Sequence, residues 1–123
     1  MYRIENENGS ITLSKNMIGN IIENAADGLS GKAVLCNAKG KTGYAEKKSM
    51  SYFDADIKDH RLYIKIYILV KFGSSIKMVT NRIIDDVNDV LRTIFGYEAE
   101  SVSVIVKGVF SKNVAKRNIE VKR

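Results

Sequence analysis

The sequence contains no proline, one cysteine and one histidine, and each shortage removes a class of structure or chemistry. Without proline, the turns must be built from Gly, Asn, Asp or Ser. Because Cys36 is the sole cysteine, it cannot form an internal disulfide, which is compatible with a reducing cytoplasm. With His60 as the sole histidine, a zinc site cannot be assembled from His and Cys ligands. The phosphate-binding patterns G-x-x-x-x-G-K-[ST] and G-x-G-x-x-G are absent as well, and we expect neither a metal nor another cofactor.

Long apolar runs are missing as well. The most apolar stretch, RLYIKIYILVKFG at residues 61–73, is shorter than the roughly 20 residues that a membrane-spanning helix needs, and Lys65 interrupts it. The N-terminal sequence MYRIENENGS has no apolar segment of the kind found in signal peptides. These features predict a cytoplasmic protein.

The 123 residues fit one domain, but the net charge of +6 is unevenly distributed. Residues 31–51 carry +4 and residues 111–123 carry another +4, so the remainder is −2. We predict a single domain over residues 1–110, with a basic loop at 31–51 and a basic, flexible tail at 111–123. Such segments are either solvated or bind RNA, anionic lipid or an acidic partner. The expected contacts for an anionic partner are Lys39, Lys41, Lys47, Lys48, Lys112, Lys116, Arg117, Lys122 and Arg123.

Residues 61–73 alternate with a period of two, which is typical of a β-strand. One set of side chains is apolar and is expected to face a layer of helices: Leu62, Ile64, Ile66, Ile68, Val70 and Phe72. The other set mixes tyrosines with lysines and predicts a partly wet face that contacts a protein partner or a second copy. With two residues of a later strand, this expected interaction face comprises Tyr63, Lys65, Tyr67, Leu69, Lys71, Ile105 and Lys107.

The flanking segments supply the remaining elements. A strand at 52–58 joins the central strand through a hairpin turn at 58–60, and a helix capped by Ser75 ends at Gly96 before a strand at 101–110. SITLS at 10–14 is a short strand, Ser14 caps a first helix that ends at Gly28 or Gly31, and residues 30–51 show no period. The order β-α-β-β-α-β predicts a two-layer α+β fold, a small mixed sheet with two helices on one face. A KH-like or ferredoxin-like variant is the alternative.

No group of polar residues forms a recognisable catalytic motif. Asp85 and Asp89 share a helix face opposite the apolar stripe, which favours a solvated surface over a metal site. His60 lies in a turn, and Cys36 has no evident base to activate it. We therefore expect no enzymatic activity and no small-molecule substrate.

Two patterns bear on nucleic acid. GLSG at 28–31 matches the G-x-x-G of a KH domain, but no convincing helix follows it, so the end of a helix is the simpler interpretation. The element order also fits an RNA-recognition motif, yet the aromatic RNP1 pattern is missing from residues 61–72. A small RNA-binding module of KH-like or open-sheet type remains the alternative function.

The ordered motifs resemble the alkaline shock protein family, a general-stress and envelope-associated family of Gram-positive bacteria. GSITLS at 9–14 is similar to its G-x-I-x-I-S start, and LYIKIYILVKFG at 62–73 resembles its central strand. IDDVNDVLRTIFGYEAESVSVIVKGVF at 84–110 looks like its closing helix and strand. Leu29-Ser30-Gly31-Lys32 departs from the V-P-G-V that usually follows the first helix in the family.

The resemblance implies a stress-response, cell-envelope-associated protein without an active site. It implies a homo-oligomer acting as an adaptor or structural protein, docked near the membrane on an integral membrane-protein anchor. Nucleic acid is the less favoured partner. Direct binding of anionic lipid through the lysine-rich loop and tail is a third hypothesis.

Overall fold

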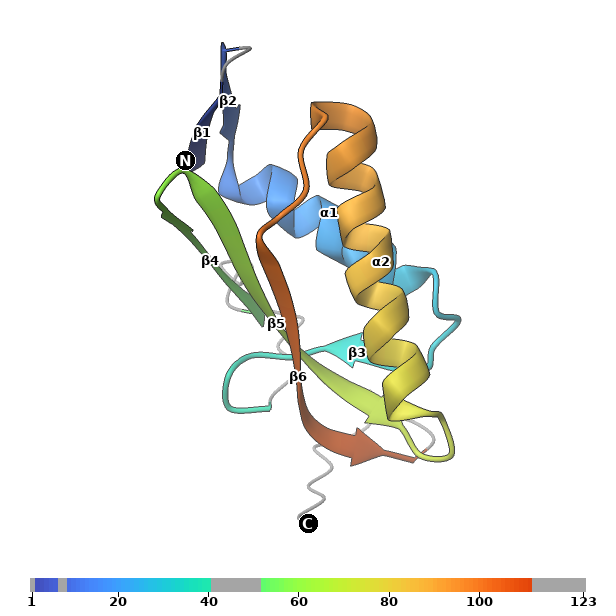
Figure 1. Cartoon of the computed structure of the whole chain (residues 1–123). Coiled ribbons are helices and arrows are strands. Elements are labelled where there is room, and N and C mark those ends of the chain that lie inside the picture. The colour runs from blue at the N-terminus through green and yellow to red at the C-terminus, as the bar shows by residue number, and fades with distance from the viewer. Residues whose placement is uncertain (1, 7–8, 41–51, 112–123) are drawn as a thin grey trace.

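The alternating stretch folds as β5 (Arg61–Lys71), the strand on which the rest of the main sheet is built (Figure 1). The computed structural model describes residues 2–6, 9–40 and 52–111. Leu62, Ile66 and Ile68 are completely buried, whereas Lys65 and Lys71 are exposed. The period-two pattern therefore identified both the strand and its buried face.

Both edges of β5 are paired. β4 (Phe53–Lys58) runs antiparallel to residues 61–66, and β3 (Ala33–Leu35) runs antiparallel to residues 68–70. β6 (Ser101–Phe110) runs parallel to β5 from Tyr63 to Lys71 and so overlaps both of these stretches. Because a strand has only two edges, β3 and β4 share one edge and β6 occupies the other. The sheet is mixed, as predicted.

The two helices begin at the serines that the sequence indicated. The Ser14 hydroxyl accepts a hydrogen bond from the Met17 N–H at 3.1 Å and starts α1 (Lys15–Asp27). The Ser75 hydroxyl accepts one from the Met78 N–H at 3.1 Å and starts α2 (Ile76–Phe95). α1 ends at Gly28, and α2 ends at Gly96, whose φ of 68° lies in the left-handed region that glycine adopts without strain.

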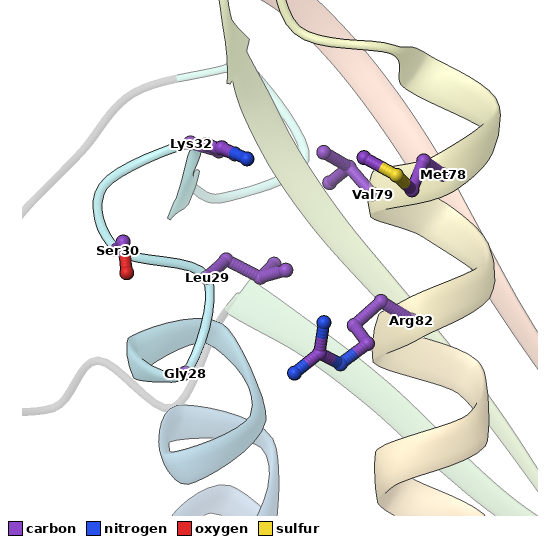
Figure 2. A pocket seen from close by; sticks show the side chains of 7 residues that line it. All are labelled: Gly28, Leu29, Ser30, Lys32, Met78, Val79 and Arg82. Atoms are coloured by element: carbon purple, nitrogen blue, oxygen red, sulfur yellow. The ribbon is translucent and has the colours of Figure 1, made fainter.

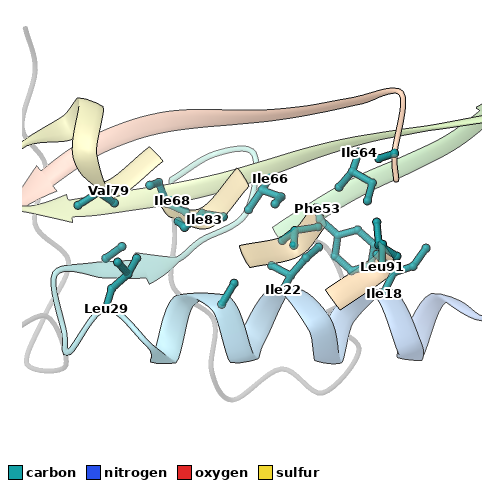
Figure 3. Packing of buried hydrophobic residues seen from close by; sticks show 14 of the residues in the cluster. Ile18, Ile22, Leu29, Phe53, Ile64, Ile66, Ile68, Val79, Ile83 and Leu91 are labelled. Carbon is teal, nitrogen blue, oxygen red and sulfur yellow. The ribbon is translucent and has the colours of Figure 1, made fainter. Parts of the chain in front are cut away.

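Both helices pack on the same face of the sheet. The core unites the even-numbered residues of β5 with Ile18 and Ile22 of α1 and Val79, Ile83 and Leu91 of α2 (Figure 3). Phe53 of β4 is 1% exposed in the middle of this layer. The predicted two-layer α+β fold, with two helices on one face, is therefore confirmed.

Three local features differ from the sequence prediction. β1 (Tyr2–Asn6) pairs antiparallel with β2 (Gly9–Leu13), and β3 lies inside the segment expected to be a loop. Phe72 was expected to face the helices but is 69% exposed. Its side chain leaves the core because β5 ends at Lys71 and the chain turns at Gly73, where φ is +94°.

Candidate functional site

The face of the sheet opposite the helices, called the open face here, carries the mixed set of side chains from β5 together with their neighbours on β4 and β6. Asp54 lies opposite Lys65, and Asp56 lies opposite Tyr63. On the other side, Ser103 lies opposite Lys65. Asp54, Asp56 and Lys65 are all exposed, so charges of both signs alternate over this half of the open face.

The two tyrosines of this face are already engaged within the chain. The Tyr67 hydroxyl donates a hydrogen bond to Asp54 Oδ2 at 2.6 Å. This bond to a carboxylate, together with burial, raises the pKa of Tyr67 above its usual range. The ammonium of Lys58 lies 5.8 Å from the ring centre of Tyr63, within the range of a cation–π contact.

The other half of the open face is closed by a second apolar cluster, which we call the minor core. It contains Cys36, Tyr67, Leu69 and Phe110, with Val34 and Ile105 packed against it. Phe110 reaches this side because the register of β6 shifts between Ile68 and Leu69 of β5. Such a bulge inserts one residue and reverses the faces to which later side chains point.

Cys36 is sealed inside the minor core. Its side chain is 2% exposed, and its backbone N–H donates to the Tyr67 carbonyl at 3.0 Å. Burial raises the pKa of the Cys36 thiol to about 12, and the positive charge of Lys107 offsets only part of that rise. A thiol held protonated in this way is a poor nucleophile.

The structure divides the expected interaction face into three groups. Lys65, Lys71 and Lys107 are exposed, Tyr63 and Ile105 are half-buried, and Tyr67 and Leu69 are buried. Bases stack on exposed aromatic rings in open-sheet RNA-binding domains. Neither tyrosine of this face is free for that purpose, and Asp54 and Asp56 place negative charge where phosphates would have to approach.

The remaining polar candidates are scattered. His60 is an exposed turn residue, Asp85 is exposed on α2, and Asp89 forms an ion pair with Arg92. Within residues 2–6, 9–40 and 52–111, no group of three or more His, Cys, Asp or Glu side chains is placed to hold a metal ion. No helix in that part of the chain is long and apolar enough to cross a membrane.

The free edge of β6 is an interaction feature that the sequence prediction did not include. In the described part of the chain, β6 pairs only with β5, which leaves its second edge without a neighbouring strand. The first six residues of β6, SVSVIV at 101–106, carry no charge and are rich in β-branched side chains. Lys107 and the bulge follow, and both features normally discourage pairing at an edge.

A shallow pocket of about 280 Å³ separates the GLSG loop from the start of α2 (Figure 2). Buried Leu29 and Val79 form its apolar part, and the exposed side chains of Lys32, Met78 and Arg82 surround it. The segment after GLSG is β3 and not a second helix, so the loop does not have the helix-to-helix setting of a KH motif. The sequence could not reveal the pocket because its two walls, residues 28–32 and 78–82, are far apart along the chain.

The pocket belongs to a larger region that we call the basic end, formed by residues 28–40, 70–84 and 106–111. The Lys71 N–H donates to the Lys32 carbonyl at 2.8 Å, and the Phe72 N–H donates to the Phe110 carbonyl at 2.7 Å, which joins the three segments. They contain six cationic residues and no acidic one. The six are Lys32, Lys39, Lys71, Lys77, Arg82 and Lys107. The lack of Asp and Glu in these three segments can be seen in the sequence, but only the topology shows that the segments lie together.

Of the cations predicted to contact an anionic partner, Lys39 is described and exposed. The other eight lie outside the described residues: Lys41, Lys47, Lys48, Lys112, Lys116, Arg117, Lys122 and Arg123.

Most of the chain matches a known protein family. A family model matches residues 3–111, and its description is the alkaline shock protein 23 family, cell envelope-related function. Neither a curated protein nor a solved structure matched the chain.

Proposed function

The chain belongs to the alkaline shock protein 23 family, which has a cell envelope-related function, and we propose that within it the protein is a non-catalytic adaptor. It associates with copies of itself and docks on a membrane-bound partner from the cytoplasm. The buried, unpaired Cys36 is compatible with that reducing compartment.

The observation that carries self-association is the free edge of β6 between Ser101 and Val106. An unpaired strand presents a row of N–H and C=O groups that a second strand can satisfy. Natural proteins protect such edges with charges, and this half of β6 has none. In a symmetric dimer the two copies use the same edge, so the strands pair antiparallel around the middle of the segment.

The non-catalytic part of the proposal is supported by how the polar side chains of the open face are used. Tyr67 is bonded to Asp54, and Tyr63 lies beneath Lys58. These polar groups contact one another across β4 and β5. The exposed mixture of Asp54, Asp56 and Lys65 suits a complementary protein surface.

A charge at Ser103 tests the association directly. Ser103 is exposed and lies at the centre of the uncharged half of β6, so antiparallel pairing brings the two copies of this residue close together. Like charges on facing positions of paired strands destabilise the pairing. We expect the wild type to form a concentration-dependent oligomer in light scattering and analytical ultracentrifugation, and Ser103→Lys and Ser103→Glu each to shift it toward monomer.

Mixing the two variants supplies the decisive control. Opposite charges at the paired position attract, so an equimolar mixture of Ser103→Lys and Ser103→Glu should associate more strongly than either variant alone. Asn81→Lys and Asn81→Glu place the same charges on an exposed position of α2 and should leave the oligomer unchanged. A wild type that stays monomeric at high concentration, or a mixture no better than its components, contradicts association through β6.

A further inference from the structure

Three large apolar side chains remain exposed close together in the sequence, at the turn from β5 into α2. Among the residues whose burial is described, 12–40 and 52–111, the exposed large apolar ones are Met17, Phe72, Ile76, Met78 and Ile94, and three of these five fall between residues 72 and 78. Phe72 is 69% exposed, Met78 55% and Ile76 48%. Single exposed apolar residues are ordinary, whereas a group of them indicates a contact surface.

This apolar group lies within the basic end. Lys71 precedes Phe72, and Lys77 stands between Ile76 and Met78, so every exposed apolar side chain of the turn has a cation beside it in the sequence. All eleven acidic residues of the described chain lie outside the basic end. Asp86 partly neutralises Arg82 at 3.6 Å, and among the described residues no carboxylate forms an ion pair with Lys71 or Lys77.

Figure 1 shows the β5–α2 turn, the first turns of α2 and the end of β6 together at one end of the molecule. The β1–β2 hairpin and the C-terminal end of α2 lie at the opposite end (Figure 1). The β5–α2 turn and the end of β6 therefore form one terminus of the described fold, and Lys71, Phe72 and Lys77 are exposed there.

We infer that the basic end docks directly on an anionic phospholipid surface. Phe72 and Ile76 enter the boundary between headgroups and acyl chains, where apolar side chains of peripheral proteins gain free energy. Lys71 and Lys77 stay at the level of the phosphates, since lysine can bury its stem and keep its ammonium in water. The pocket beside the GLSG loop receives a lipid headgroup between Lys32 and Arg82 (Figure 2).

Charge complementarity favours a lipid surface over an acidic protein as the occupant. The centres of protein–protein interfaces are depleted of lysine, whereas here a lysine stands next in the sequence to each of the three apolar residues of the turn. A membrane interface accommodates both kinds of side chain at different depths. The inference rests on the envelope association of the proposed function, but not on self-association through β6.

A tryptophan at position 72 gives a direct readout because the chain contains no tryptophan of its own. The probe is a vesicle made of about equal parts of phosphatidylcholine and phosphatidylglycerol. With it, the full-length Phe72→Trp variant should show a blue shift of its fluorescence and quenching by brominated acyl chains. Pure phosphatidylcholine vesicles should produce neither change. Ile94→Trp, at the other end of α2 and of similar exposure, should remain unshifted with both vesicles.

The affinity for anionic vesicles, measured by flotation, separates the contribution of the apolar side chain from that of the lysines. Phe72→Ser should weaken binding by about tenfold, and each of Lys71→Ala and Lys77→Ala by about fivefold. Ile94→Ser and Lys58→Ala remove comparably exposed side chains away from the basic end and should have little effect. Thermal melting checks that every variant is folded, which is expected because all of these positions are exposed.

Three results would overturn the inference: absence of binding to the anionic vesicles, an unshifted spectrum of the Phe72→Trp variant, or equal losses for Phe72→Ser and Ile94→Ser. If binding disappears only when residues 112–123 are deleted and ignores Phe72, the tail and not the basic end is the lipid contact. Oligomer size measured on Phe72→Ser keeps the two proposals apart, because association through β6 should be unchanged in this variant.

Discussion

At the scale of single residues, the open face is defined by what its side chains already bind. Tyr67 donates a hydrogen bond to Asp54 and packs within the minor core. The alternation places this tyrosine on the partly wet face, but in the structure it is buried. Cys36 is buried in the same way, and its raised pKa is a direct consequence of burial. Both groups stabilise the fold in their protonated forms, which makes their contribution dependent on pH.

Alkaline titration of Cys36 provides a test. Its thiol ionises at about 9 when unfolded and at about 12 in the folded protein, so the folded state holds the proton more tightly. A raised folded pKa contributes stability below pH 9, and this contribution is lost as the pH rises toward 12. Between pH 9 and 10, the free energy of unfolding of the wild type should fall by about 1 kcal/mol more than that of Cys36→Ala.

Urea unfolding at closely spaced pH values measures this difference, and comparing slopes removes the constant cost of the cavity left by alanine. Tyr52 and Tyr67, whose pKa values are also raised, are present in both proteins and cancel. Parallel pH profiles for the two proteins would show that Cys36 is not held protonated. Slow reaction of the native thiol with a disulfide reagent, accelerated in urea, is the matching chemical readout.

At the scale of elements, alternation and capping in the sequence were sufficient to locate β5, α2, β4 and β6. These segments are long, strongly periodic, or closed by Ser75 and Gly96. β3 could not be recognised because three residues, Ala33–Leu35, are too few to show a period. Pairing with β5, a contact between distant parts of the chain, is what makes this segment a strand.

The candidate site was predicted less completely than the fold. The alternation placed Lys65 and Lys71 on the exposed side of β5 correctly, but it could not reveal that Tyr67 and Leu69 are covered. Their cover depends on Phe110, which changes face only because of the bulge in β6. The extra residue in β6 cannot be recognised from the sequence pattern alone, because a bulge is defined only by the pairing of β6 with β5.

The turn between β4 and β5 allows a stability test at this scale. Asp59 and His60 have φ values of +52° and +64°, so a two-residue hairpin turn holds two ordinary L-residues in the left-handed region. Turns of this kind favour Asn-Gly. Replacing Asp59-His60 by Asn-Gly should raise the free energy of unfolding by about 0.5–1 kcal/mol, because glycine removes the steric cost at residue 60.

His60→Ala is the matched control, since it removes the imidazole but keeps the Cβ atom that causes the strain. It should not stabilise the protein in urea unfolding, whereas Asn-Gly should raise the midpoint without changing the slope. A destabilised Asn-Gly variant would mean that the His60 side chain contributes packing beyond the turn.

At the scale of the whole molecule, the two proposed contact surfaces have a fixed geometric relation. The C-terminal end of β6 lies at the basic end, because the carbonyl of Phe110, its last residue, accepts a hydrogen bond from the Phe72 N–H. A two-fold axis that joins two β6 edges makes the strands antiparallel. The basic ends of the two copies must then face in opposite directions, so a dimer cannot place both of them on one flat membrane.

This relation predicts that the associated protein bridges membranes. At concentrations where the wild type is oligomeric, it should cluster phosphatidylglycerol-containing vesicles, which dynamic light scattering detects as growth in particle size. Ser103→Lys should bind the same vesicles without clustering them, because it keeps Phe72 and the lysines of the basic end but loses the second copy. Phe72→Ser should lose both effects in proportion to its weaker binding. If a strictly monomeric Ser103→Lys still clustered vesicles, one chain would have to carry two lipid contacts. Bridging of membranes would then not depend on association through β6.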